Sequence, residues 1–335
     1  MKVPLLAAAV LLVWTLPLGA QRSLAERLGY SRSDKLLIIN IDDVALSDAA
    51  NAAAVDALEH GLPTSASIMV PAPWFPDIAA FARAHPQMDF GVHVALTSEW
   101  RGYRWRPVAG ACGVPGLVDA QGYLWSRVDS VYVHATPEEA EREARAQIEQ
   151  ARAAGIDVTH IDSHMDALYF DARYLAVFIT LARDYDLPIR LPSQDWLRSH
   201  GSGNVRQEIA AQGIVAPDLL IPGGYPAGAS IKSVWLQVLH ALQPGVTEVY
   251  IHAALPGAEM RDITGEVPAG WRERAEEYEL FTHDADIRAL LQRDGVRLIG
   301  YRALRDLQRR ERAEIANGLE VTVPGLSSRS VANDP

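Results

Sequence analysis

Short apolar runs rich in β-branched residues alternate with amphipathic stretches along most of the chain. The apolar runs predict strands at residues 36–42, 65–70, 90–96, 158–164, 188–192, 219–222, 248–253 and 297–301. The amphipathic stretches predict helices at residues 48–60, 75–84, 137–154, 172–185, 233–242, 284–293 and 304–317. This alternation predicts an α/β fold built of parallel β/α units, in the form of a barrel or a distorted relative with seven or eight strands.

Capping signals support the ends of these helices. Ser47 or Asp48 can cap the helix that ends before Gly61. Thr136 is the expected cap of the helix at 137–154, because Pro137 and two glutamates follow it.

The segment 97–135 interrupts the alternation of strands and helices. It carries six aromatic residues among glycines and prolines: Trp100, Tyr103, Trp105, Tyr123, Trp125 and Tyr132. Long loops in compact domains are usually functional or disordered, and disordered segments are poor in aromatic residues. Two interpretations stay open, an ordered lid that binds sugar rings and a satellite core beneath a long loop.

Composition and charge narrow the classes of function. The chain has 335 residues, of which 49% are apolar and 22% charged, an ordinary balance for a globular protein. A formal net charge of −11 argues against nucleic acid as the main partner. The single cysteine, Cys112, excludes an internal disulfide and a Cys-His zinc motif.

The N-terminus, MKVPLLAAAVLLVWTLPLGAQRS, predicts a secretory signal peptide that is cleaved near Ala20. The alternative is an uncleaved anchor, for which the apolar stretch is short. The predicted organisation is a signal peptide at 1–20, a linker at 21–35, one domain at 36–318 and a loose tail at 319–335. We therefore expect an exported protein, periplasmic or secreted, without stable membrane insertion after cleavage.

Acids and histidines gather at the predicted strand ends. Asp42 and Asp43 end the first strand, His93 lies in the third, and His252 ends the seventh. The fourth predicted strand ends in THIDSHMD. If the extended conformation persists there, one face of the strand carries His160, Asp162, His164 and Asp166. The carboxyl ends of barrel strands converge on one mouth, where active sites lie.

Each of these residues alone also has a structural interpretation. A single histidine in a strand is commonly a hydrogen-bonded core residue, and an Asp-Asp pair before a helix can be a turn. Several polar side chains on a buried face, however, need mutual partners or a metal. The combination favours a divalent metal site.

These residues also carry a family resemblance. The segment IINIDDVALSDAANAAAVDALEHGLPTSASIMV resembles the opening of the YdjC/ChbG-like carbohydrate deacetylases. Five later segments are similar to further motifs of that family: FGVHVALT, GVPGLVDAQGYLW, HIDSHMD, WRERAEEYELF and GVRLIGYRAL. The resemblance therefore spans residues 36–304.

The resemblance implies a barrel-like hydrolase that removes acetyl groups from N-acetylated oligosaccharides with one divalent metal, zinc or magnesium. It implies Asp43, His93 and His164 as metal ligands and Asp42 as the general base, although the two aspartates can exchange roles. Two histidines and one carboxylate suit zinc, whereas magnesium prefers oxygen ligands. His252 and Asp166 are the candidates for the acid that protonates the leaving amine.

Three departures from the family pattern affect this interpretation. Val44 and Ala45 follow the aspartates in place of Phe-Gly, Asp166 replaces the last histidine of His-x-Asp-Ser-His-x-His, and a His-Pro-Gly stretch is lengthened to HAALPG. Two alternatives therefore remain, a metal-dependent hydrolase of another bond, such as a phosphoester, and a carbohydrate-binding protein with reduced catalysis. The oligomeric state stays open, a homodimer included.

Overall fold

The computed structural model describes residues 22–319 except 227 and 266–269. The predicted signal peptide at 1–20 and residues 320–335 of the predicted tail lie outside the described residues. Within the described part, no helix is both long and apolar enough to cross a membrane.

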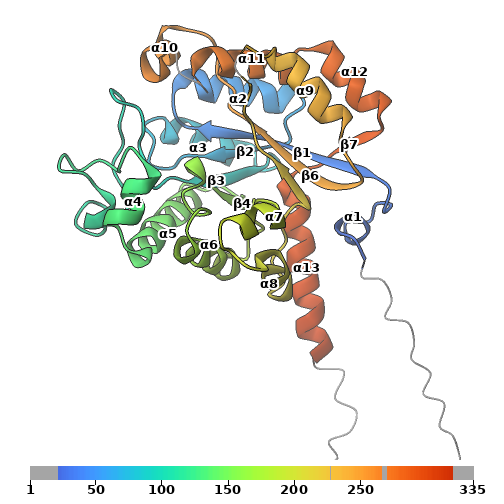
Figure 1. The fold of residues 1–335 in the computed structure, drawn as a ribbon, viewed down its shortest axis with the longest axis horizontal. Helices are drawn as coiled ribbons and strands as arrows, with labels where there is room; N and C mark the ends of the chain where they lie inside the picture. Colours follow the sequence, from blue (N-terminus) through green and yellow to red (C-terminus); the bar gives the residue numbers. More distant parts are fainter. Residues whose placement is uncertain (1–21, 227, 266–269, 320–335) are drawn as a thin grey trace, which may run out of the picture.

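Seven parallel strands form one curled sheet, a half-barrel (Figure 1). The strands are β1 (Lys35–Val44), β2 (Ser65–Ile68), β3 (Phe90–Val94), β4 (Val158–Ser163), β5 (Leu219–Ile221), β6 (Gly245–Ile251) and β7 (Val296–Leu298). Their order is β4-β3-β2-β1-β6-β5, and β7 pairs with the start of β1. The predicted barrel-like α/β fold is confirmed, in a form that is open between β4 and β5.

One of the eight predicted strands, the fifth at 188–192, is wrong. Ile189 makes only an isolated bridge to Ile161 of β4. Pro188 and Pro192 bound this segment, and proline has no N–H to donate to a ladder of hydrogen bonds. The segment therefore touches the edge of the sheet without extending it.

The helices at the seven predicted places are α2 (Asp48–His60), α3 (Phe75–Ala84), α5 (Pro137–Ala153), α6 (Ala172–Tyr185), α9 (Ile231–His240), α12 (Ala285–Arg293) and α13 (Tyr301–Leu319). Two expected caps are present. The Ser47 hydroxyl accepts from the Ala50 N–H, and Thr136 forms a capping box with Glu139.

Further helices arise where no helix was predicted: α1 (Leu24–Arg27), α4 (Val128–His134), α7 (Gln194–Ser199), α8 (Val205–Ala211), α10 (Ala258–Thr264) and α11 (Trp271–Thr282). The structure also contains two 3-10 turns, η1 (Pro115–Leu117) and η2 (His164–Asp166). The predicted linker at 21–35 thus contains a helix, and Leu24 and Ala25 are buried against the sheet.

The two faces of β1 explain how the half-barrel is filled. Leu37, Ile39 and Ile41 face the covering helices and belong to the main apolar core. On the inner face, Leu36 and Ile38 pack with α1 and α13, whereas the later Asn40 and Asp42 are polar and buried. The inside of the half-barrel is therefore apolar where the strands start and polar where they end.

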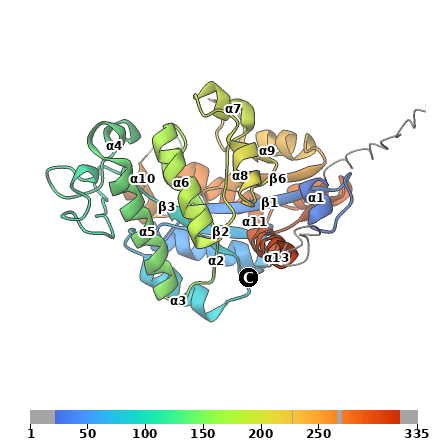
Figure 2. The same ribbon diagram turned by 90° about the horizontal axis from the view of Figure 1, so that it is seen from below.

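The long segment 97–135 lies at the end toward which the strands point, opposite α1 and α13 (Figures 1 and 2). Trp105, Leu117 and Leu124 are buried in the main core, as the satellite-core interpretation expects. The Glu143 carboxylate of α5 accepts the N–H groups of Val108 and Ala109, at 2.9 Å each, and so fastens the segment to the domain. Of its six aromatic residues, Trp105 is thus a core residue, and Trp100, Tyr103, Trp125 and Tyr132 are partly buried against the same core.

Candidate metal centre

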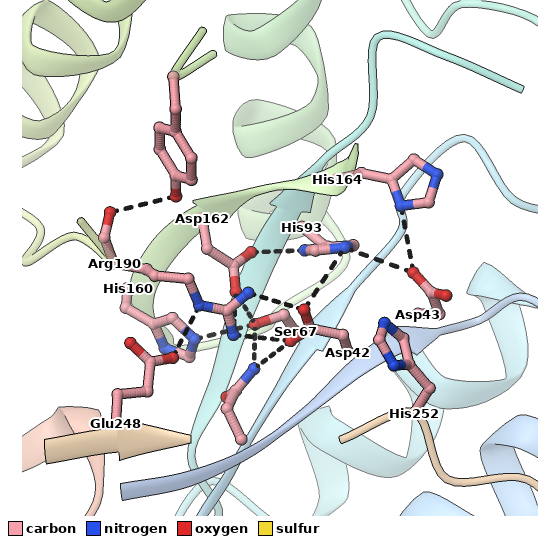
Figure 3. A network of polar contacts seen from close by, with 12 residues as sticks. Asp42, Asp43, Ser67, His93, His160, Asp162, His164, Arg190, Glu248 and His252 are labelled. Carbon is pink, nitrogen blue, oxygen red and sulfur yellow. Dashed lines mark hydrogen bonds and ion pairs between the residues drawn. The ribbon is translucent and has the colours of Figure 1, made fainter. Parts of the chain in front are cut away.

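Three predicted ligands meet at the carboxyl ends of three strands. Asp43 is near the end of β1, His93 is in β3, and His164 directly follows β4. Asp43 Oδ1 lies 3.4 Å from His93 Nε2 and 3.2 Å from His164 Nδ1 (Figure 3). All three residues are buried, and one ligand atom from each falls within 4.8 Å of the others.

The Asp43 carboxylate fits a cation at this point. Oδ2 accepts a hydrogen bond from Arg274 Nη2 at 2.7 Å. Oδ1 is buried and accepts no hydrogen bond, although two imidazole nitrogens face it. A buried carboxylate oxygen without a partner is costly, and a metal ion held by these three atoms would remove the cost.

The second nitrogen of each imidazole is already engaged. His93 Nδ1 lies 2.7 Å from Asp162 Oδ1, and His164 Nε2 lies 3.0 Å from Glu99 Oε2. A carboxylate takes the N–H of the imidazole and leaves the lone pair on the other nitrogen, which is how metal-binding histidines are usually oriented. The free lone pairs are thus on the two nitrogens that face Asp43.

The surrounding charges favour a positive charge between these groups. Burial lowers the pKa of His164, but Glu99 and Asp43 outweigh it and raise the pKa to about 9. Burial also lowers the pKa of His93, and the negative charges of Asp162 and Asp42 hold it well above its usual range instead. The same negative charges favour a metal cation between the two imidazoles and Asp43.

Asp42 differs from Asp43, although the two are adjacent. Both of its oxygens accept from the Arg190 guanidinium at 2.7 Å, and Oδ1 also accepts from Asn40 at 2.8 Å. Arg190 is in turn held by Glu248 at 2.8 Å, in a buried network. The Asp42 charge is therefore compensated by arginine, and its carboxylate is fixed in one orientation.

Asp42, His93 and Asp162 form a second group with ligand-like spacing. Its carboxylates already have partners, because Arg190 Nη2 lies 3.1 Å from Asp162 Oδ2 as well as contacting Asp42. Ser67 donates to the same Asp162 oxygen at 2.6 Å. The group around Asp43 is therefore the better cation site.

The predicted common face of the fourth strand is only partly present. β4 ends at Ser163, and the chain then turns through η2, where Met165 and Asp166 adopt positive φ of 50° and 54°. His160 stays inside the half-barrel, stacked on Tyr301 at 3.9 Å and 3.0 Å from the Ser67 hydroxyl. It is a hydrogen-bonded core histidine at a distance from the metal group.

Strained backbone accompanies the proposed ligands. Asp43 has φ of 60° and Ala45 has φ of 81°, on either side of Val44. Residues other than glycine rarely adopt positive φ, and such strain concentrates at functional sites. The departures from Phe-Gly and from the last histidine of the motif thus fall on the two turns that present Asp43 and His164.

A pocket of about 310 Å³ opens over this centre. Asp166 and His252, the two candidate acids, both line it together with Asp42. The His252 side chain is 23% exposed, and burial lowers its pKa to about 4. The structure therefore brings all six predicted site residues to one pocket.

Seven other residues that line the pocket were not predicted as site residues: Glu99, Trp100, Ser163, Met165, Arg190, Tyr250 and Arg274. A signal for Arg190 exists in the sequence, since it is a charged residue within the apolar run LPIRLP. Arg274 belongs to the motif WRERAEEYELF, but the pattern does not indicate its contact with Asp43.

The comparisons with known proteins agree with this arrangement. The family model for YdjC-like proteins matches residues 36–293. The chain belongs to the YdjC-like family. A protein named carbohydrate deacetylase from Thermus thermophilus is 33% identical over 78% of this chain and 90% of its own length.

Two other members extend the comparison. A carbohydrate deacetylase from Brevibacillus brevis is 37% identical over a shorter match, which covers 48% of this chain and 60% of the relative. The crystal structure of an Enterococcus faecalis protein described as a cellobiose-phosphate cleavage protein superposes with a TM-score of 0.70 and is 27% identical. That match covers 81% of this chain and 99% of the other.

Proposed function

We propose that this YdjC-like protein is a metal-dependent deacetylase of N-acetylated carbohydrates. The observation that carries the proposal is the unpartnered Asp43 oxygen, which faces one nitrogen each of His93 and His164 in a buried pocket. The family membership and the relatives named carbohydrate deacetylase support the choice of reaction.

Asp43, His93 and His164 would hold the metal. Two imidazole nitrogens and one carboxylate oxygen suit zinc better than magnesium, which prefers oxygen ligands. We therefore propose zinc as the bound ion. When bound, a divalent ion supplies polarisation of the acetyl carbonyl and a lowered pKa for water.

Asp42 is the proposed general base. Oδ1 already accepts two hydrogen bonds, from Asn40 and Arg190, whereas Oδ2 accepts one and lies 3.9 Å from His93 Nε2. Oδ2 is thus the oxygen beside the ligand group, with a lone pair left for the proton of the attacking water. The partners of the two aspartates support this division of roles, because both Asp42 oxygens bind Arg190, whereas Asp43 Oδ1 faces two histidines.

Asp166 and His252 are the proposed groups for protonating the leaving amine. Both line the pocket, and the Asp166 side chain makes no hydrogen bond or ion pair within the described part of the chain, although its backbone oxygen accepts from the Tyr169 N–H. It stands on the turn after His164, at the place of the last histidine in the family motif that this segment resembles. A carboxylic acid at this place can therefore take over a proton transfer that an imidazole performs elsewhere.

Acetate release tests the proposed function. We expect the zinc-loaded protein to release acetate from N-acetylated oligosaccharides and to lose this activity after chelation, with recovery on adding zinc back. Phosphate release from sugar phosphates without acetate release would support the phosphoester alternative. Tight glycan binding by the metal-loaded protein without any release would support the binding-protein alternative.

We further propose that the protein is exported. Lys2, the apolar run and the small residues up to Ala20 support a cleavable signal peptide. N-terminal sequencing of the protein from culture medium or periplasm should give a start near Gln21. Intact Met1 in a washed membrane fraction would contradict cleavage.

A further inference from the structure

The turn that presents Asp43 is strained at a neighbouring residue whose side chain carries no ligand atom. Ala45 has φ of 81°, and Asp43 itself has φ of 60°. Glycine adopts such angles readily, whereas the Cβ of alanine makes them costly. Ala45 is also completely buried. The surrounding structure must therefore hold Ala45 in this conformation.

A buried asparagine of α2 makes a direct contact with the strained residue. Asn51 Oδ1 accepts the Ala45 N–H at 2.8 Å, and Asn51 is 2% exposed. Without this acceptor, the Ala45 N–H would be a buried donor that lacks a partner, a costly state unless the backbone changed its angles. The hydrogen bond from Ala45 to Asn51 thus favours the strained conformation over a relaxed one.

The Asn51 amide is itself fixed on its other side. Nδ2 donates to the Trp74 carbonyl at 3.1 Å and to Asp77 Oδ2 at 2.9 Å, so the partners define which way the amide points. The Trp74 N–H in turn donates to the Ala45 carbonyl at 3.1 Å. Both backbone polar groups of Ala45 are therefore bonded, one to the Asn51 side chain and one to the start of α3.

A relaxation at Ala45 would move Asp43, which is two positions earlier in the chain. The Asp43 carbonyl accepts the Leu46 N–H at 3.1 Å, so residues 43–46 form one hydrogen-bonded turn. Asp43 Oδ1 faces the two imidazole nitrogens of the ligand group at 3.2 and 3.4 Å (Figure 3). Because ligand atoms must stay within about 0.5 Å of their productive positions, a small rotation of this turn weakens metal binding.

We infer that Asn51 is a positioning residue of the metal centre, which holds the strained turn at Ala45 and so directs Asp43 Oδ1 at the two histidines. This inference rests on the proposed function, in which Asp43 is a metal ligand. The competing explanation is that Asn51 only joins α2 to α3, through Asp77, and has no effect on Asp43.

Asn51→Ala removes the acceptor and introduces a residue that suits a helix. Its zinc affinity, measured by titration against a competing chelator, should fall about ten- to hundredfold, the usual effect of losing a group that orients a metal ligand. Asp77→Ala is the matched control, because it removes one contact of the Asn51 amide and leaves the bond to Ala45. This control should keep the zinc affinity of the unmodified protein.

Ala45→Gly distinguishes the positioning role from a purely structural one. Glycine adopts φ of 81° without strain, so the turn no longer depends on Asn51. Adding Ala45→Gly to Asn51→Ala should therefore restore most of the lost zinc affinity. If Asn51 only joined α2 to α3, the loss should persist in the double variant. The absorption spectrum of the Co²⁺-loaded proteins reports ligand geometry and should return toward that of the unmodified protein in the same variant.

Zinc affinity and acetate release together separate this inference from the proposed function. If zinc binds and no sugar releases acetate, the deacetylase proposal fails, and the affinities still decide the role of Asn51. Unchanged affinity in Asn51→Ala, or a loss that Ala45→Gly does not reverse, would overturn the positioning role and leave the deacetylase proposal intact. A protein that binds no zinc would overturn both.

The double variant also carries the test if Asn51→Ala alone does not fold. It lacks both the strain and the hydrogen bond that compensates it, so it should fold and bind zinc nearly as tightly as the unmodified protein. A loss of about tenfold or more in the folded double variant would contradict the inference, because the Asn51 side chain would then matter for a reason other than the strain at Ala45.

Discussion

His164→Ala should lose the bound metal and the acetate-releasing activity together. The substitution removes one of three protein ligands and leaves Asp43 Oδ1 with a single imidazole facing it. Zinc sites depend on their full set of ligands, so metal content after dialysis should fall from about one ion per chain to near zero. Metal analysis and an acetate assay on the same preparation measure both effects.

His134→Ala is the matched control for this substitution. His134 is exposed at the end of α4 and stacks on Trp125, away from the pocket. The His134→Ala variant should retain both the bound metal and the acetate-releasing activity. Retention of a full equivalent of metal by His164→Ala, with unchanged affinity, would remove His164 from the ligand set and leave the convergence around Asp43 unexplained.

The convergence of Asp43, His93 and His164 could be predicted because it depends on fold class more than on detailed packing. Once residues 36–42, 90–96 and 158–164 are predicted to be parallel strands, their carboxyl ends must lie at one edge of the sheet. Asp43, His93 and His164 stand at those ends. Helix caps such as Ser47 and Thr136 were predictable for a different reason, since they depend on contacts three residues away.

The partners of these ligands could not be predicted from the sequence in the same way. Arg274 contacts Asp43 from 231 positions away, and Glu99 reaches His164 from an irregular segment. No periodicity encodes such contacts, because they depend on how α11 and the segment 97–135 pack over the strand ends.

The sequence also did not indicate how far along a strand each polar residue lies from the carboxyl end of the sheet. Alternation correctly places His160 and Asp162 on one face of β4, but each residue advances the strand by about 3.3 Å, so His160 lies well inside the half-barrel. There it meets Ser67 and Tyr301. The end of the strand at Ser163 then redirects His164 toward Asp43.

Asp42→Asn should retain the metal and lose roughly two to four orders of magnitude in the rate of acetate release, the usual contribution of a general base. The amide keeps the shape of the side chain but cannot take a proton from water. Asp43→Asn should instead lose metal, because Asp43 Oδ1 faces both histidines. Metal content and acetate release of the two variants therefore separate the two roles. Metal loss in Asp42→Asn with retention in Asp43→Asn would show that the aspartates have exchanged roles.

A purely structural effect of Asp42→Asn is the competing explanation, since Asp42 is also a partner of the buried Arg190. Glu248→Gln tests it, because Glu248 holds Arg190 at 2.8 Å from the opposite side and does not line the pocket. If the position of Arg190 were the cause, both variants should lose activity to a similar extent. If Asp42 is the base, Glu248→Gln should keep most of the activity, and only Asp42→Asn should lose the acidic limb of the pH–rate profile, where the base becomes protonated. Thermal unfolding of each variant ensures that the rates compare folded proteins. A base role for Asp42 requires both results, because only a group that exchanges a proton with the reacting water changes that limb.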